Sequence, residues 1–139
     1  MADTRTRAPW SWYGLALAFA ALIGFAFYSE CAQGDSQRRD AHRALRCLLG
    51  PPPVAAAEVD ARYRARRDAA HAEGGRYPQA CRAAVASAAR YHGNASSAPL
   101  QFALEDLARL LAADDAHLAD AAVRERLGRI VVLAGFDAR

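Results

Sequence analysis

The side chains best suited to chemistry in this sequence are three cysteines and four histidines. The cysteines, Cys31, Cys47 and Cys81, form no CxxC or CxxCH pattern, so the motifs of thioredoxin-like redox sites, zinc ribbons and covalent haem attachment are missing. The histidines are scattered and form no HxxxH or HExxH pair; they are His42, His71, His92 and His117. We therefore expect ordinary surface histidines and neither a metal site nor another cofactor.

Motifs of the main enzyme classes are missing as well. The sequence contains no GxSxG nucleophile motif, no Walker loop, no GxGxxG loop and no convincing pair of carboxylates. Asp114 and Asp115 fit a helix cap, while Glu105 and Asp106 fit polar positions in an early helical turn. Because no pattern pairs a nucleophile with a base, the sequence predicts a protein that is not an enzyme.

Cys47 and Cys81 are the pair that favours covalent chemistry. Each lies beside the apolar stripe of an expected helix, and a further helix between them can bring the two together. In an oxidising compartment they would form a disulfide, which stabilises a small domain by roughly 3–4 kcal/mol for a loop of about 34 residues. The alternative is two buried, unreactive thiols. Cys31 is left over, and it either pairs with a second copy of the chain or has no role.

The elements that position these residues begin with an uncharged apolar stretch, which covers residues 8–29. About twenty helical residues match the ~30 Å hydrocarbon core of a bilayer. Aromatic rings, which prefer the headgroup level, mark both ends of the stretch: Trp10, Trp12, Tyr13 and Tyr28. We expect one membrane-spanning helix that stays uncleaved as an anchor.

Small residues repeat along this span at four-residue spacing, at Ala16, Ala20 and Gly24. Such a face suits helix packing in membranes, and it would serve a homodimer or a membrane partner. Alanine is so common in this chain that chance also produces the pattern.

The charges around the span give conflicting signals about orientation. Arg5 and Arg7 precede it, and Glu30 and Asp35 follow it, which favours a cytoplasmic N-terminus. Further arginines from position 38 onward argue for the reverse. Because a short tail followed by one span and a domain most often translocates the domain, we expect a single-pass protein of a bacterial inner membrane. Its domain would lie on the periplasmic side.

The rest of the sequence predicts an all-α domain of four to five short helices. Asp35 or Ser36 can cap the first, and Gly50 followed by Pro51–Pro53 ends it. We divide the chain into a tail (1–9), the transmembrane helix (10–29), a juxtamembrane linker (30–36) and the helical domain (37–139).

Three details of these helices are open to test. The second expected helix has an apolar face made mostly of alanine, at Ala57, Ala61, Ala65, Ala69 and Ala72. The fourth has the clearest apolar stripe, which serves as core or, alternatively, as a docking face: Leu100, Leu104, Leu107 and Leu111. The segment 130–133 is β-branched enough to form a strand instead of a helix.

The basic residues are all arginine. The sequence has eighteen of them and no lysine, which together with the excess of alanine is typical of a GC-rich genome. The arginine-rich stretch 38–67 is interspersed with acidic residues and has no aromatic series beside it. This favours a solvated helix surface over nucleic-acid binding.

These observations predict a membrane-anchored, non-enzymatic protein-interaction or assembly module, for example an accessory subunit of a larger envelope complex. Its partners would be the lipid bilayer and another envelope or membrane protein. One alternative is a small periplasmic sensory or ligand-binding domain whose histidines and arginines line a pocket. Another is a cytoplasm-facing, arginine-rich module that binds anionic lipid or nucleic acid.

Overall fold

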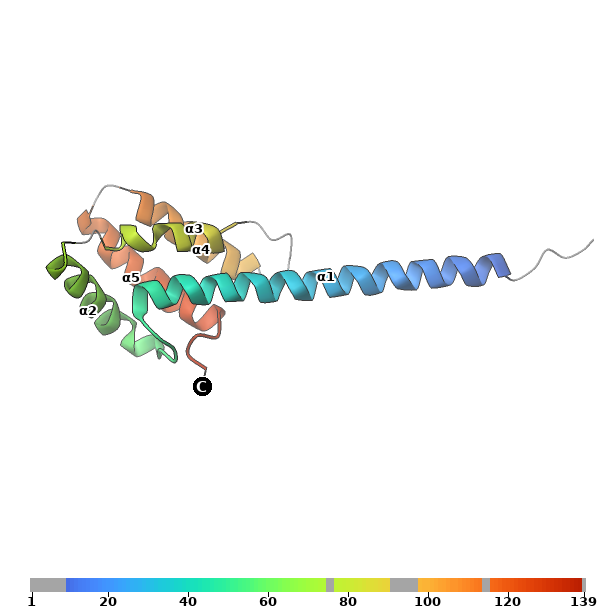
Figure 1. Cartoon of the computed structure of the whole chain (residues 1–139), viewed down its shortest axis with the longest axis horizontal. Helices are drawn as coiled ribbons and strands as arrows, with labels where there is room; N and C mark the ends of the chain where they lie inside the picture. The colour runs from blue at the N-terminus through green and yellow to red at the C-terminus, as the bar shows by residue number, and fades with distance from the viewer. Residues whose placement is uncertain (1–9, 75–76, 91–97, 114–115, 139) are drawn as a thin grey trace, which may run out of the picture. The chain divides into compact units, whose positions relative to one another are not determined.

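The computed structural model describes the backbone of residues 10–74, 77–90, 98–113 and 116–138, and the side chains of these residues except 10–11 and 116–119. Within these ranges every regular element is a helix (Figure 1). The chain divides into two compact units, Met1–Ala32 and Gln33–Arg139. The predicted all-α class with one long apolar N-terminal helix is therefore confirmed.

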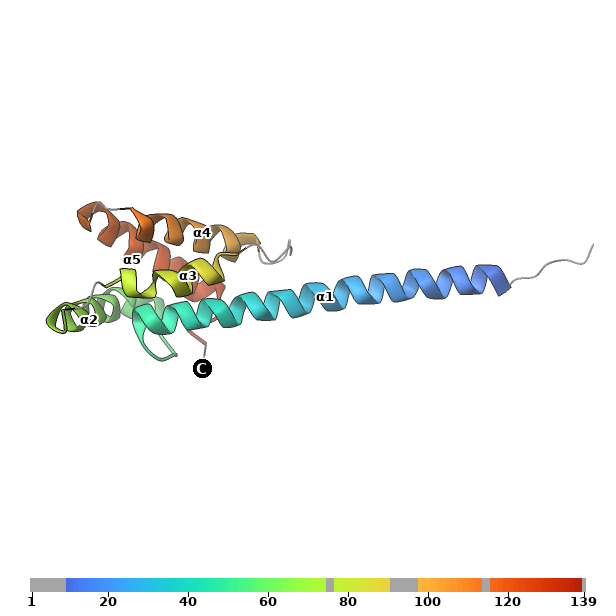
Figure 2. The ribbon, with the colours of Figure 1, turned by 45° about the horizontal axis from the view of Figure 1, so that its top comes forward.

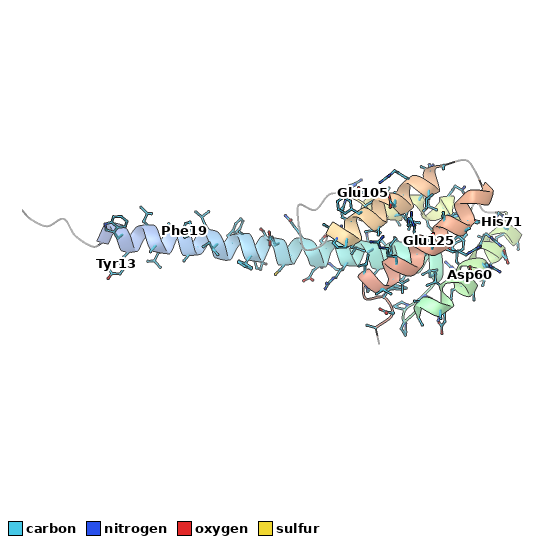
Figure 3. The ribbon with its side chains drawn as sticks, turned by 180° about the vertical axis from the view of Figure 1, so that it is seen from behind. Tyr13, Phe19, Asp60, His71, Glu105 and Glu125 are labelled. Carbon is cyan, nitrogen blue, oxygen red and sulfur yellow. A yellow bond between two sulfur atoms is a disulfide. The ribbon has the colours of Figure 1, made fainter. Side chains whose placement is uncertain are left out.

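The first unit contains the N-terminal part of α1, the 40-residue helix Trp10–Leu49. Its large apolar side chains between Trp12 and Tyr28 are 45–77% exposed. Figure 3 shows two of them, Tyr13 and Phe19, projecting outward from the helix. By length and composition this segment is able to cross a membrane.

Residues 30–36, which we expected to be a linker, are helical and belong to α1. The prediction that Asp35 or Ser36 caps a new helix is therefore wrong. No proline interrupts this segment, and its one glycine, Gly34, costs only about 1 kcal/mol relative to alanine in a helix. The helical hydrogen bonds consequently continue into the turns that bury their apolar side chains in the second unit.

The second unit packs the last turns of α1 against shorter helices (Figures 1 and 2). α5 packs against α4 and α2, and α3 packs against α4. Because the segment 130–133 lies within α5, the strand alternative is wrong. The bounds are η1 Ala56–Glu58, α2 Val59–Ala72, η2 Gln79–Cys81, α3 Arg82–Ala88, α4 Ala98–Ala112 and α5 Ala116–Leu133.

The core of the second unit follows the predicted apolar stripes in most helices. α1 buries Leu45 and Leu48, and α3 buries Val85 and Ala88, as their helical spacing predicts. Residues from α4 and α5 complete the same cluster. One contiguous core therefore holds this unit together.

α2 buries different residues from those expected. The alanines predicted to form its apolar face are all exposed: Ala57, Ala61, Ala65, Ala69 and Ala72. The helix buries Val59 and Tyr63 instead. Burying an aromatic ring removes about 150–250 Å² of surface from water, far more than burying the methyl group of an alanine. The ring therefore determines which face of the helix packs against the core.

The C-terminus of α5 has a Schellman cap. Gly135, with φ 64°, adopts the left-handed conformation that this cap needs. Its N–H donates to the carbonyl of Val132 at 3.1 Å, and the N–H of Phe136 donates to the carbonyl of Val131 at 2.9 Å. The turn directs Phe136 into the core, where it is fully buried.

The end of α1 is shaped by the prolines that follow it. Because Pro51–Pro53 carry no N–H, the last carbonyls of α1 cannot accept the usual bond from four residues further on. Side chains provide the missing donors. Arg66 Nη2 donates to the carbonyl of Cys47 at 3.3 Å, and the Tyr77 hydroxyl donates to the carbonyl of Leu48.

The same end of α1 carries the disulfide. Cys47 and Cys81 are bonded, with their Cα atoms 5.7 Å apart, which confirms the predicted pairing. The bond joins the last turn of α1 to η2, the segment that follows Tyr77. The disulfide and the hydrogen bond of the Tyr77 hydroxyl therefore join the same two segments. Cys31 is free and exposed.

Two ion pairs join α2 to α5. Arg67 pairs with Asp120 at 2.7 Å, and this carboxylate also accepts a hydrogen bond from the Tyr63 hydroxyl at 3.3 Å. Arg124 pairs with Asp60 at 2.5 Å. Polar contacts on α2 thus compensate for its small buried apolar surface.

We predict that replacing both Cys47 and Cys81 by serine lowers the free energy of unfolding by roughly 3 kcal/mol, because the broken cross-link releases a loop of about 34 residues. Denaturant unfolding of the full chain in detergent micelles, followed by circular dichroism, measures the loss. Cys31→Ser is the matched control and should leave the midpoint unchanged. A double variant as stable as the wild type would contradict the prediction.

Tyr77→Phe should lower the free energy of unfolding by about 1–3 kcal/mol, because it leaves the buried carbonyl of Leu48 without its donor. The same unfolding experiment applies. Tyr28→Phe removes a hydroxyl from an exposed ring and should have no measurable effect. Equal midpoints for the two variants would show that the Tyr77 hydrogen bond contributes nothing.

Stability should fall at alkaline pH. Burial raises the pKa of Tyr63 and of Tyr77, with the Asp120 charge adding to the first and Tyr63 to the second. A tyrosine whose pKa is higher in the folded than in the unfolded state stabilises the fold fully below about pH 10. Above that pH the stabilisation is lost, and the free energy of unfolding falls by up to about 2.7 kcal/mol per pH unit for the two tyrosines.

Unfolding midpoints between pH 9 and pH 11 in a Cys31→Ser background, which prevents disulfide exchange, measure this slope. The double variant Tyr63→Phe, Tyr77→Phe should lose most of it. An unchanged slope in that variant would assign the pH dependence to other groups.

Candidate functional site

The turns of α1 in the second unit carry arginines on the face opposite their buried stripe. The four, which we call the arginine face, are all exposed: Arg38 and Arg39 are adjacent, and Arg43 and Arg46 follow at spacings of four and three residues. This spacing places them along one side of the helix, as a continuous row of guanidinium groups.

The arginine face lines a hollow with a volume of about 690 Å³, which we call the arginine groove. Three further residues complete its lining: Asp35, His42 and Ala134. Four guanidinium groups therefore face a single carboxylate. The groove is open to solvent along the helix, and its electrostatic character is strongly positive.

His42 forms part of the groove wall and is already engaged. Its Nε2 lies 2.9 Å from the carbonyl of Ala134, and its ring meets the edge of Phe136 at a centroid distance of 5.1 Å. Since a carbonyl only accepts, Nε2 is the protonated nitrogen. The residue fixes the C-terminus of α5 against α1 and so shapes the groove.

A second hollow, of about 570 Å³, lies next to the first, and we call it the proline hollow. Its lining is Arg46, Gly50, Pro51, Pro52 and Arg66. Arg46 lines both hollows, so the positive surface continues from one into the other.

The charges of the arginine face are poorly neutralised. Arg43 pairs with Asp40 at 3.3 Å, and its side chain remains 72% exposed. In the described ranges of the chain, Arg38, Arg39 and Arg46 form no ion pair with a carboxylate. These three guanidinium groups are therefore available to an external anion.

Most arginines on the other helices are paired. Those of α2 that point away from the proline hollow pair within the helix or with α5, and one arginine of α4 and two of α5 pair with nearby acids. The paired arginines are Arg62, Arg64, Arg67, Arg109, Arg124 and Arg126. Exposed arginines without an ion pair in the described ranges also occur outside the hollows, at Arg82, Arg90 and Arg129, but the two hollows gather such arginines along one strip.

The aromatic residues expected to anchor the span are exposed where the structure describes them. Trp12, Tyr13 and Tyr28 are 67–77% exposed on α1, while the side chain of Trp10 lies outside the described residues. The small residues Ala16, Ala20 and Gly24 are exposed on the same helix, and their role in helix packing stays a prediction.

The leucines that we considered as a docking face belong to the core. None is more than 4% exposed: Leu100, Leu104, Leu107 and Leu111. The docking alternative is therefore wrong for these residues, because α4 turns its apolar stripe toward α3 and α5. The large apolar side chain that α4 leaves exposed is Phe102, on the opposite side.

The histidines are dispersed. His71 is exposed near the end of α2 (Figure 3), and the side chains of His92 and His117 lie outside the described residues. Among the residues that the structure describes, no three His, Cys, Asp or Glu side chains gather as a metal site would require.

Sequence reasoning considered a pocket lined by histidines and arginines only as an alternative and did not locate it. The spacing of the arginines was visible as a face of one helix, but Ala134 in the arginine groove and Arg66 in the proline hollow come from segments further along the chain. Comparisons with protein-family models, with curated proteins and with solved structures yield no match. The functional argument therefore rests on the surfaces and the chemistry of the chain itself.

Proposed function

We propose that this chain is a single-pass, membrane-anchored interaction module without enzymatic activity, with its helical domain on the oxidising, periplasmic side of a bacterial inner membrane. An accessory subunit of an envelope complex fits this description.

The exposed apolar surface of α1 is the observation that carries the proposal. All large side chains between Trp12 and Tyr28 point into the surroundings, and none of this segment is buried within the chain. Exposing this much apolar surface to water would cost about 25 cal/mol per Å². A lipid environment removes the cost and also satisfies the helical backbone, whose hydrogen bonds are internal.

The Cys47–Cys81 bond supports the oxidising side. Disulfides persist in compartments such as the periplasm and are rare in the cytosol, where thiols are kept reduced. Arg5 and Arg7 before the span are consistent with this orientation, because basic residues prefer the cytoplasmic side.

The arginine groove supports an interaction role. It offers several guanidinium groups for an anionic partner, and its lining contains no Ser, Thr or Cys. The groove also supports a second candidate, a sensory domain for a small acidic ligand, since one of the four histidines, His42, lines it together with arginines.

Thiol labelling in spheroplasts tests the anchor and its orientation. In a Cys31→Ser background, a membrane-impermeant maleimide should label the partly buried Cys47 only after a reductant has been added, because Cys47 is disulfide-bonded on the accessible side. The variant Cys81→Ser, which leaves Cys47 as a free thiol, should be labelled without the reductant.

Labelling that needs no reductant but requires lysis would place the domain in the cytoplasm and overturn the proposal. The cytoplasm-facing, arginine-rich module would then take its place. Recovery of the chain in the soluble fraction after lysis would overturn the membrane anchor itself.

A further inference from the structure

The described part of the chain neutralises the positive charge of the arginine groove only in part, through Asp35 in the lining and the pair of Arg43 with Asp40. Arg38, Arg39 and Arg46 are exposed, and no carboxylate in the described ranges pairs with them. A row of like charges on neighbouring helical turns is mutually repulsive, and it costs stability unless an anion lies among them. A bound anion would relieve this repulsion.

The length of the positive strip indicates the size of that anion. The rise from Arg38 to Arg46 is about 12 Å along the helix. Arg66, which lines the proline hollow beyond Arg46, extends the strip further. A single phosphate or carboxylate would engage only one or two of these groups, whereas an extended peptide, at about 3.3 Å per residue, covers the row with about four residues.

We propose that the arginine groove, continued by the proline hollow, binds an extended acidic segment of a partner protein. Aspartate and glutamate side chains of the segment pair with the guanidinium groups of Arg38, Arg39 and Arg46, whose planar donors match a carboxylate in two-pronged geometry. Asp35 repels a carboxylate at its end of the groove, so the acidic run ends before reaching it.

The walls of the proline hollow are held in place before a partner arrives. Arg62 donates to the carbonyls of Pro51 at 3.3 Å and Pro53 at 3.4 Å, and it pairs with Glu58 at 3.2 Å. The disulfide fixes Cys47, the neighbour of Arg46. A surface that is already ordered loses less entropy when it binds a flexible segment.

Other polyanions fit this surface less well. No Phe, Tyr or Trp lines either hollow, so unpaired bases would find no stacking platform. Attraction of basic segments to anionic lipid is typical of the cytoplasmic leaflet, and the inference rests on the proposed periplasmic side of the domain. An acidic protein segment remains the occupant that the length, openness and charge of the strip favour.

The test uses a fluorescein-labelled hexaglutamate peptide and the full chain in detergent micelles, with fluorescence anisotropy as the readout. The groove variant carries Arg38→Gln, Arg39→Gln and Arg46→Gln. A matched control carries Arg82→Gln, Arg90→Gln and Arg129→Gln, which removes the same charge from exposed arginines that line neither hollow. Circular dichroism checks that both variants keep their helices.

We expect saturable binding of hexaglutamate, no binding of hexaglutamine, a loss of affinity of about tenfold or more in the groove variant and less than about twofold in the control. Equal losses of affinity in the two variants would show that only the net charge of the chain matters, and would overturn the inference. Displacement of the peptide by citrate at a concentration far below that of hexaglutamate would overturn it in favour of a small-ligand site.

Tighter, groove-dependent binding to phosphatidylglycerol vesicles than to the peptide would assign the surface to lipid instead. Failure of the inference is distinguishable from failure of the proposed function. The binding assay uses purified chain and is independent of orientation, whereas thiol labelling reads the side of the membrane and is independent of the groove.

Discussion

The last carbonyls of α1 need hydrogen-bond donors that the following backbone cannot provide, because Pro51–Pro53 carry no N–H. Their donors come instead from Arg66 on α2 and from Tyr77 just before η2. Both segments are thereby drawn to the point where α1 ends. The disulfide reinforces this junction, since it joins the same turn of α1 to the residue that ends η2. The packing of the second unit depends on how this one helix is terminated.

α1 itself carries two kinds of surface in succession along its sequence. Between Trp12 and Tyr28 every side has large apolar side chains, while from position 37 onward one side is buried and the other is occupied by arginines. An all-round apolar helix is stable in lipid, whereas a helix with one apolar stripe is stable against a protein core. The change of pattern separates a segment that is able to cross a membrane from the turns of the same helix that pack in the second unit.

The buried face of a helix could be predicted from the sequence where leucine and valine form the apolar stripe, as in α1, α3 and α4. The spacing of these large apolar residues determines which face packs against the core. The same reasoning was wrong for α2, where alanine is too small to decide between faces and Tyr63 prevails. The burial of Phe136 follows from a cap rather than a stripe, so periodicity alone could not reveal it. Gly135, two residues after the last residue of α5, was the available signal.

The arginine groove shows why counting charges along a sequence does not predict a surface. Acidic residues are interspersed through the stretch 38–67, which indicated a balanced, solvated helix face. In the structure Asp40 pairs with Arg43 of the row, but the other two acids serve other arginines: Glu58 pairs with Arg62, and Asp60 pairs with Arg124 on α5. Their charge is therefore used at the contact between α2 and α5 and beside the prolines, and the row along α1 keeps its excess. Charges that cancel along a sequence need not cancel in space, and an excess that survives folding is where an anionic partner gains most.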